Sequence, residues 1–180
     1  SQGEDCVNPI VISSLPYNTT DDTSNYGDNY DTADRPALGG EQYVNGTGSA
    51  SYLTGDDAVY SFTPTVDGVY SFDLSNTIDD WIGFWLFEGC PFTSIVARHT
   101  AISGTTRSLP NLNLVNGTTY YVVISTWASP QSTPYSLDVT QITCPSPSDL
   151  DATNIMIASA DLSWVENGTA SLYNVEVVMS

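Results

Sequence analysis

Carboxylates are concentrated in one short stretch near the amino terminus, TTDDTSNYGDNYDTADR, residues 19–35. No basic side chain interrupts them before Arg35. Two carboxylates about 4 Å apart repel by about 1 kcal/mol in water, and by several times more where solvent is partly excluded. Calcium reverses this repulsion, because it gathers roughly six to eight oxygens from Asp, Asn and backbone carbonyls. The stretch therefore predicts a calcium site.

The predicted ligands come from this stretch and from a second acidic pair at the entry to a later strand. Gly27 supplies a bend, and the absence of a D-x-D-x-D-G order excludes an EF-hand. Ligands from both places would hold residues 19–35 against a sheet. The alternative is that these aspartates are turn residues and solvating charge on a salt-adapted surface. The predicted metal set is Asp21, Asp22, Asn25, Asp28, the carbonyl of Tyr30, Asp31, Asp56 and Asp57.

Catalytic patterns are weak. A catalytic triad is improbable, because the only histidine, His99, is not accompanied by a Gly-x-Ser-x-Gly motif in the sequence. A zinc site is no better supported, because Cys90 and His99 are not part of a CxxC or HExxH motif. Asp79 and Asp80 invite comparison with a glycosidase pair, but adjacent residues on a strand point to opposite faces, so a turn is favoured. We expect a protein that is not an enzyme.

Aromatic side chains are the better indication of binding, because flat apolar rings can stack on sugar rings without charge. Trp81 and Trp127 both stand beside polar turn residues, in DDW and TWASPQ, and are candidates for exposure. Trp85, inside IGFWLFE, is expected in the core. Tyr26 and Tyr30 flank the predicted metal loop and either extend a binding surface or pack over the loop.

The charge balance excludes whole classes of partner. The chain of 180 residues has 21 acidic side chains and only three basic ones, Arg35, Arg98 and Arg107, which gives a net charge of -18. Nucleic acids and anionic membranes are bound through clustered Lys and Arg, so neither is expected as a partner. Anionic polysaccharides are disfavoured for the same reason, unless a metal ion bridges.

Three cysteines leave at least one thiol unpaired within the chain. A bridge from Cys6 to Cys144 would join the two ends of one domain, while a bridge involving Cys90, or no bridge, fits the sequence equally well. No apolar run approaches the roughly 20 residues that span a bilayer, and the first residues, SQGEDC, have no signal-peptide core. We expect a mature, soluble chain.

Apolar residues recur mostly at period two, which predicts strands rather than helices. In GVYSFDLS, for example, Tyr70, Phe72 and Leu74 share one face, which we expect to be core. Asp67-Gly68 and Asn116-Gly117 predict two antiparallel hairpins. The fold class is therefore all-β, an antiparallel, jelly-roll-like sandwich over residues 1–143. The predicted strands are 9–15, 58–64, 68–75, 82–88, 106–114, 119–126 and 134–142.

A second unit is predicted over residues 144–180, after the proline-rich CPSPSDL. DLDATNI, SADLSWV and LYNVEVVM are expected to be strands, with Trp164 buried and a turn at Asn167-Gly168. So short a segment cannot close a sandwich of about seven strands. It is expected to be the opening part of a truncated module whose unpaired edges are either disordered, folded over the first domain, or paired with another molecule, including a second copy.

Residues 4–142 resemble the bacterial pre-peptidase C-terminal (PPC) domain-like modules of secreted Bacteroidetes proteins. EDCVNPIVISSLPYNTTDDTSNYGDNYD, GDDAVYSFTPTVDGVYSFDLS and NGTTYYVVISTWASPQSTPYSLDV carry the resemblance jointly. CPSPSDL and ADLSWVENG are similar to the start of a fibronectin type III domain. The resemblance implies a secreted or cell-surface, non-catalytic, often calcium-stabilised sandwich appended to an enzyme or adhesin. A second cysteine expected shortly after Cys90 is absent, with Val96 and Ala97 in its place.

These observations give a lead hypothesis and a rival. The lead is a calcium-stabilised accessory module that binds a polymeric extracellular substrate, with neutral polysaccharide favoured. The rival is a structural spacer or adhesin segment with no ligand of its own. Exposed, coplanar Trp81 and Trp127 would favour the lead, and burial of both would favour the rival.

Overall fold

The computed structural model describes residues 1–43, 52–143, 146–167, 173 and 175. It divides the chain into two compact units, Ser1–Gln141 and Ile142–Ser180. The first unit is a β-sandwich, which confirms the predicted fold class, and in the described residues the only helical turn is the 3-10 helix η1 (Thr23–Asn25). No helix among these residues is long and apolar enough to cross a membrane.

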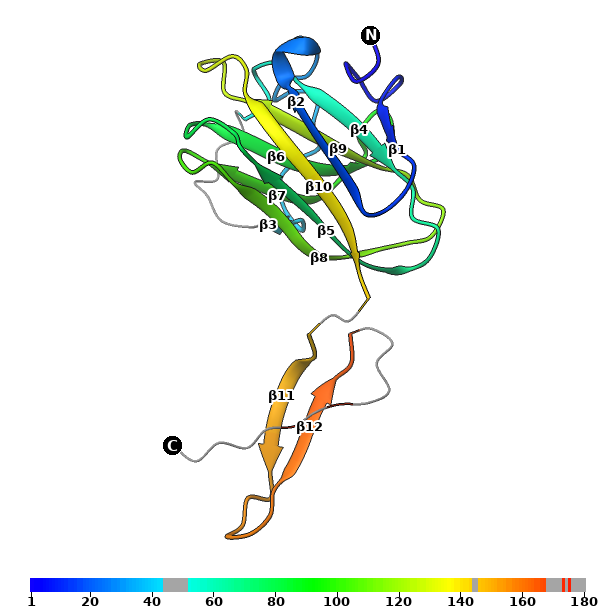
Figure 1. The fold of residues 1–180 in the computed structure, drawn as a ribbon, viewed down its shortest axis with the longest axis vertical. Helices are drawn as coiled ribbons and strands as arrows, with labels where there is room; N and C mark the ends of the chain where they lie inside the picture. Colours follow the sequence, from blue (N-terminus) through cyan, green and yellow to red (C-terminus); the bar gives the residue numbers. More distant parts are fainter. Residues whose placement is uncertain (44–51, 144–145, 168–172, 174, 176–180) are drawn as a thin grey trace. The chain divides into compact units, whose positions relative to one another are not determined.

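One layer of the sandwich is a six-stranded sheet (Figure 1). Its inner pairs, β4–β9, β9–β6 and β6–β7, are antiparallel, whereas the edge strands β1 and β3 add in parallel to β4 and β7. In sheet order the strands are β1 (Ile10–Ile12), β4 (Ala58–Phe62), β9 (Tyr120–Thr126), β6 (Ile82–Glu88), β7 (Ser94–Ala101) and β3 (Gln42–Tyr43).

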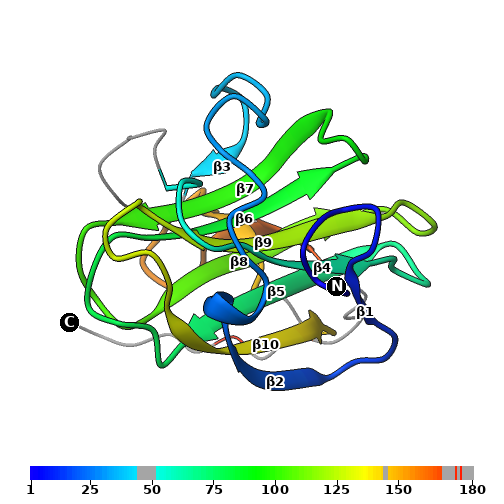
Figure 2. The same cartoon turned by 90° about the horizontal axis from the view of Figure 1, so that it is seen from above.

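The other layer is a four-stranded sheet that lies over the first, as the turned view shows (Figure 2). The main core is formed where the two layers face each other, and both contribute to it. Tyr70, Phe72 and Leu74 are all at most 1% exposed in this core, as the alternation predicted. In sheet order the strands are β2 (Tyr17–Asp22), β10 (Pro134–Ile142), β5 (Gly68–Ser75) and β8 (Arg107–Leu114).

Both predicted hairpins are wrong. β4 and β5 belong to different sheets, and so do β8 and β9, so each turn passes from one layer to the other. A turn dipeptide reverses the chain, but it does not determine which sheet the chain enters next, and a few residues suffice to cross the roughly 10 Å between layers. The two crossings contact each other, because Asn116 N–H donates to Asp67 Oδ1 at 2.7 Å and Gly117 N–H donates to Pro64 O at 2.9 Å.

A second apolar cluster covers the outer face of the six-stranded sheet. Trp85, Val59 and Val123 are fully buried there, beneath residues that include Tyr30 and Leu38 from the segment between β2 and β4. Sheets with both faces covered have strands that are buried throughout, and β4 is buried at all of its positions. Trp85 is a core residue, as predicted, although it lies in this outer cluster.

The second unit contains the antiparallel strands β11 (Ser148–Thr153) and β12 (Asp161–Val165). Trp164 is half-buried rather than buried, because Tyr173 covers only part of it, with 4.9 Å between the ring centroids. Most of the third predicted strand, LYNVEVVM, and Gly168 of the predicted turn lie outside the described residues.

Candidate functional site

The acidic stretch is not one loop. Asp21 and Asp22 end strand β2, which pairs with β10 so that Asp21 lies opposite Tyr135. The sequence pattern missed this strand because it is polar, YNTTDD, and has one half-buried face at the sheet edge. β2 therefore fixes part of the carboxylate cluster through backbone hydrogen bonds with β10.

Asp21 accepts three hydrogen bonds from within the protein. They come from the Tyr26 hydroxyl at 2.5 Å, Asn25 Nδ2 at 2.7 Å and the backbone N–H of Asp22 at 2.8 Å. Desolvation raises the pKa of Asp21, but these hydrogen bonds outweigh it and leave the pKa lowered. Burial and the hydrogen bond to Asp21 raise the pKa of the Tyr26 phenol. Asn25 directs its amide nitrogen, not its oxygen, toward the cluster.

Asp22 and Asp31 have the contacts of turn residues. Asp22 caps η1 by accepting from Ser24 N–H at 2.9 Å, and Asp31 accepts from Ala33 N–H at 2.6 Å. Asp31 also donates its backbone N–H to Asp34 Oδ2 at 2.8 Å. These local bonds are what the alternative interpretation of the stretch expects.

Asp57 joins residues 27–30 of the acidic stretch to the six-stranded sheet. It immediately precedes β4 and is fully buried. Its Oδ2 accepts from the backbone N–H groups of Tyr30 at 2.7 Å and Asn29 at 3.1 Å, and its own N–H donates to Gly27 O at 2.9 Å. Residues 27–30 are therefore held to the sheet by one carboxylate and by the main chain.

The second oxygen of Asp57 is unusual. Oδ1 is buried and has no hydrogen-bond partner among the described residues. The Ser125 hydroxyl, which donates weakly to Gly55 O at 3.3 Å, is close enough to lower the pKa of Asp57, as are the amides of Tyr30 and Asn29. Desolvation outweighs these groups, and with the nearby charge of Asp28 it raises the pKa of Asp57 to about 7.

Asp56 points to a different neighbour. It accepts from Gln131 Nε2 at 3.3 Å, and its N–H donates to Gln131 O at 2.7 Å. The predicted ligands are therefore spread over β2, η1, the segment that follows η1 and the two residues before β4. In the described residues no group of three or more His, Cys, Asp or Glu side chains is arranged to hold a metal ion. Among the predicted ligands, the unpartnered Oδ1 of Asp57 is the oxygen best suited to a cation, and Asp28 is the carboxylate whose charge acts on Asp57.

Trp81 and Trp127 lie together at one end of the six-stranded sheet, just before β6 and just after β9. Trp127 N–H donates to Trp81 O at 3.0 Å, and the two ring centroids are 5.3 Å apart with the rings tilted by 55°. The fully buried Tyr52 supports both indoles, with its centroid 6.1 Å from each. Both tryptophans are half-buried. Because their rings are inclined to each other, they form a tilted pair rather than a coplanar platform.

Tyr26 and Tyr30 have structural contacts. The ring of Tyr26 packs so closely against Gly3 that a Cβ there would lie 2.6 Å from it. The hydroxyl of Tyr30 accepts from Cys6 N–H at 2.8 Å, and its ring lies 4.8 Å from that of Phe92. Both side chains are half-buried, in keeping with the interpretation that they pack over the loop.

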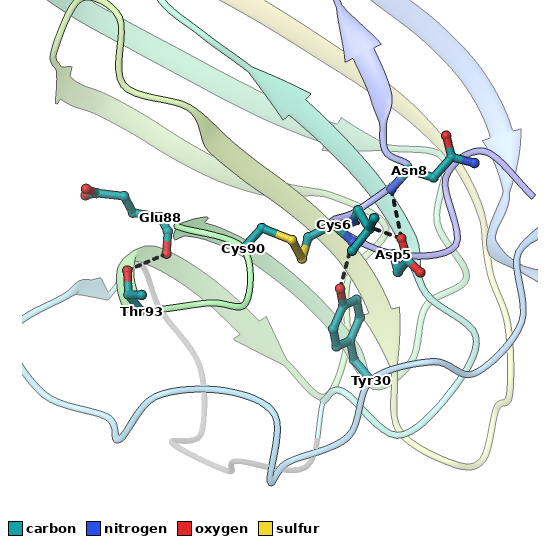
Figure 3. Close-up of a disulfide and its surroundings, with 8 residues drawn as sticks. Asp5, Cys6, Asn8, Tyr30, Glu88, Cys90 and Thr93 are labelled. Atoms are coloured by element: carbon teal, nitrogen blue, oxygen red, sulfur yellow. Dashed lines mark hydrogen bonds between the residues drawn. A yellow bond between two sulfur atoms is a disulfide. The ribbon is translucent and has the colours of Figure 1, made fainter.

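A disulfide joins Cys6 to Cys90, across 84 residues of sequence (Figure 3). It ties the amino-terminal segment to the turn between β6 and β7, beside Tyr30. The alternative of a Cys6–Cys144 bridge is therefore wrong, because Cys6 has a different partner. The sequence offered no local signal for this pairing, since the two cysteines meet only through the layering of the sandwich.

Sequence reasoning also missed what the arginines do. Arg98 forms a buried ion pair with Glu41, with 2.8 Å between Nε and Oε1, and its guanidinium lies 3.8 Å from the centre of the Tyr43 ring. Arg107 is 2% exposed and donates to five backbone carbonyls, those of Asp80, Ile82, Ala101, Gly104 and Thr106. The rarity of basic residues in so acidic a chain was the available signal.

No protein-family model matches the chain, and no curated protein matches it in sequence. Among solved structures, the chain is similar to PliG of Aeromonas hydrophila, a periplasmic inhibitor of g-type lysozyme, with 8% identity and a TM-score of 0.41 over 74% of this chain and 95% of that one. It is also similar to the GH26-CBM35 β-(1,4)-mannanase of Podospora anserina, with 13% identity and a TM-score of 0.36 over 76% of this chain and 30% of that one. Values this low leave the function to be argued from the chain's own residues.

Proposed function

We propose that the first unit is a non-catalytic accessory module of a secreted multidomain protein and that it binds a neutral polysaccharide at Trp81 and Trp127. The observation that carries the proposal is the pair itself. Two large aromatic rings remain partly exposed at the end of a sheet, although the core of the same sheet buries almost every other aromatic side chain. Partly exposed indoles at a loop-bearing edge are suited to stacking on sugar rings.

The charge distribution supports a neutral ligand. Arg98 and Arg107 are buried in internal contacts, and Arg35 is half-buried and donates to Pro36 O at 2.8 Å. The chain has no lysine, so no cationic patch is available on a surface of net charge -18. Polyanions would be repelled, whereas the stacking of neutral sugars is independent of charge.

Calcium is the second part of the proposal. A cation beside Asp57 Oδ1 would satisfy a buried oxygen that has no partner among the described residues, and Asp28 and the carbonyl of Tyr30 are further oxygens of the predicted set. The three hydrogen bonds on Asp21, and the capping role of Asp22, argue for a smaller ligand set than the sequence predicted. The ion would stabilise the segment that covers the outer apolar cluster.

The Cys6–Cys90 bridge supports the secreted location, because structural disulfides persist in oxidising compartments. It agrees with the resemblance to PPC-like modules followed by the start of a fibronectin type III domain, which remains part of the proposal.

A structural spacer is the second candidate function. It is favoured by the 55° tilt between the indoles and by their packing on Tyr52, which give them a reason to be present without a ligand. The structural contacts of Tyr26 and Tyr30 point the same way.

Retention on insoluble neutral glycans separates the two candidates. Cellulose, mannan, xylan, chitin and starch are incubated with the full chain and with three variants, Trp81→Ala, Trp127→Ala and Trp164→Ala. We expect at least one glycan to retain the wild type and Trp164→Ala, while either of the first two substitutions weakens retention about tenfold, since a lost stacking contact is worth about 1.4 kcal/mol. Trp164→Ala is the matched control because this half-buried tryptophan belongs to the second unit. Failure of every glycan to retain the wild type would leave the spacer as the function.

A further inference from the structure

A groove lies on the four-stranded sheet, and neither Trp81 nor Trp127 lines it. It has a volume of about 340 Å³, within the range of about 300–1,000 Å³ that is usual for small-ligand sites. Strands β5, β8 and β10 contribute side chains to it, and one residue comes from β7 of the other sheet. The side chains used below are those of Asp73, Ser75, His99, Arg107, Ser108 and Asp138.

Asp73 and Ser108 lie directly opposite each other on β5 and β8. The Ser108 hydroxyl donates to Asp73 Oδ1 at 2.6 Å, which fixes the carboxylate and leaves its second oxygen without a partner among the described residues. Asp73 is exposed. An anchored carboxylate with a free oxygen on an open face is a ready acceptor for a ligand hydroxyl.

Asp138 is held in the same way from the other side. Asn18 Nδ2, on the neighbouring strand β2, donates to Asp138 Oδ1 at 2.6 Å. Beyond it the sheet continues as a hydrogen-bonded polar row, because the Ser136 hydroxyl contacts Thr20 Oγ1 at 3.1 Å and accepts from Asn76 Nδ2 at 2.9 Å. The groove therefore has two anchored acceptors, Asp73 and Asp138.

His99 supplies a further polar group. Its Nδ1 lies 2.9 Å from the backbone nitrogen of Ser108 and 3.1 Å from Ser108 O, so it accepts from that N–H in one tautomer and donates to that carbonyl in the other. In both tautomers Nε2 has no partner among the described residues. Burial lowers the pKa of His99 and Arg107 adds to this effect, against an opposing contribution from the Ser108 backbone. A neutral imidazole therefore presents Nε2 to a ligand beside the carboxylate acceptors.

Arg107 forms part of the groove wall but is not a free cation. Its guanidinium is used by five backbone carbonyls. The carboxylates would repel an anionic ligand, and no described group in the groove has the arrangement of a metal site. What remains is a pair of anchored carboxylates and a neutral imidazole, together with the hydroxyls of Ser75 and Ser108, and this set matches a ligand that has several hydroxyl groups.

We propose that this groove binds a sugar ring of the neutral glycan, with Asp73 and Asp138 accepting hydrogen bonds from its hydroxyls and His99 Nε2 forming a further one. The inference rests on the proposed function, which it deepens by adding a second contact region on the opposite layer of the sandwich. A site built to pair with hydroxyls discriminates strongly against ligands that lack them, because its anchored groups would lose solvent without gaining partners.

The test uses soluble hexasaccharides of glucose, mannose and xylose and the full chain labelled with nitrogen-15. Titration is followed by NMR at the His99 ring and the Ser108 amide, and by calorimetry. We expect saturable shifts at both positions with at least one hexasaccharide. Asp73→Ala and Asp138→Ala should each weaken binding at least about tenfold, whereas Asp151→Ala, an exposed strand aspartate of the second unit, should leave binding unchanged.

Two further arms keep the inference separate from folding defects and from the proposed function. Asp73→Asn retains an acceptor for Ser108, so it should keep the fold and bind with an intermediate affinity. In a Trp81→Ala/Trp127→Ala background, persistence of the His99 and Ser108 shifts supports the groove. Binding that is lost in this background but unaffected by Asp73→Ala and Asp138→Ala would overturn the groove and leave the proposed function standing. Binding of glucosamine hexamer alone, with none of the neutral oligomers, would overturn the assignment of a neutral ligand.

Discussion

Asp57 affects the stability of the fold and also belongs to the proposed calcium site. Its folded-state pKa of about 7 is above the ordinary value of 3.8, so the folded protein binds a proton more tightly than the unfolded chain does. Stability from this group is therefore present at acid pH and is lost as the pH rises from about 4 to about 7. The full loss is on the order of 4 kcal/mol, at about 1.36 kcal/mol per pKa unit.

Asp57→Asn tests this directly. The amide oxygen can still accept from the Tyr30 and Asn29 N–H groups, and the side chain no longer ionises. In chelator, we expect the free energy of unfolding of the wild type, measured in urea, to fall between pH 5 and pH 8 relative to that of Asp57→Asn. Parallel pH profiles for the two proteins would contradict a raised pKa. Asp56→Asn, whose carboxylate is paired with Gln131 near the surface, is the matched control.

Arg107 contributes to stability in a different way, because its side chain joins the start of β6 to the end of β7 and to the turn between β7 and β8. Lysine keeps the charge but has only three donors on a point-like ammonium. We expect Arg107→Lys to reduce the free energy of unfolding by about 3 kcal/mol, since several charge-assisted hydrogen bonds to buried carbonyls are lost. Urea denaturation measures the loss. Arg35→Lys, at the half-buried arginine, should cost less than about 1 kcal/mol, and equal costs would argue against the special role of Arg107.

At the scale of elements, the Cys6–Cys90 bridge fastens the amino-terminal segment to the β6–β7 turn. Closing a loop of this length is expected to stabilise the fold by about 4 kcal/mol. The double substitution Cys6→Ala/Cys90→Ala should therefore lower the melting temperature strongly, and Cys144→Ala should not. Alkylation without reduction, followed by peptide mapping, should label Cys144 alone. A label on Cys6 or Cys90 would contradict the pairing.

The sequence pattern predicted some strands accurately and missed others. Period-two alternation located β5, β6 and β10 to the residue, because each buries one or both faces with β-branched or aromatic side chains. β2 and β7 were missed because their patterns are interrupted. The burial of Arg98 on β7 depends on Glu41, a residue far away in the sequence.

Local sequence signals could not predict which strands pair in each sheet. Asp67-Gly68 and Asn116-Gly117 indicated where the chain reverses, but whether it stays in one sheet depends on how the layers pack. For the candidate site, the sequence placed Asp57 in the predicted ligand set, but it did not predict that this residue is fully buried with one oxygen that has no partner among the described residues. Its burial results from the segment around Tyr30 folding over the outer face of the sheet. The groove around Asp73 combines four strands that are distant in sequence, so no single stretch could indicate it.

At the scale of the whole molecule, the calcium proposal makes one prediction about thermal stability. An ion that binds only the folded state raises stability by about 2.7 kcal/mol at a free concentration one hundred times the dissociation constant. We expect the melting midpoint of the full chain to fall on addition of chelator and to recover when excess calcium, but not magnesium, is restored. Asp57→Asn should respond less than the wild type does. A midpoint that does not change with chelator would contradict the calcium site and favour the interpretation that the aspartates are turn residues and solvating surface charge.

The internal use of the arginines has a consequence for resistance to proteolysis. Trypsin-like proteases cut after Lys or Arg, and they need the target segment to leave its place and enter a narrow cleft in extended form. This chain has no lysine, and its three arginines are fixed in the folded unit by an ion pair, by backbone carbonyls, or by partial burial. In the native state the molecule therefore offers such enzymes almost no cleavable bond, and its lifetime among them is set by how rarely the sandwich opens.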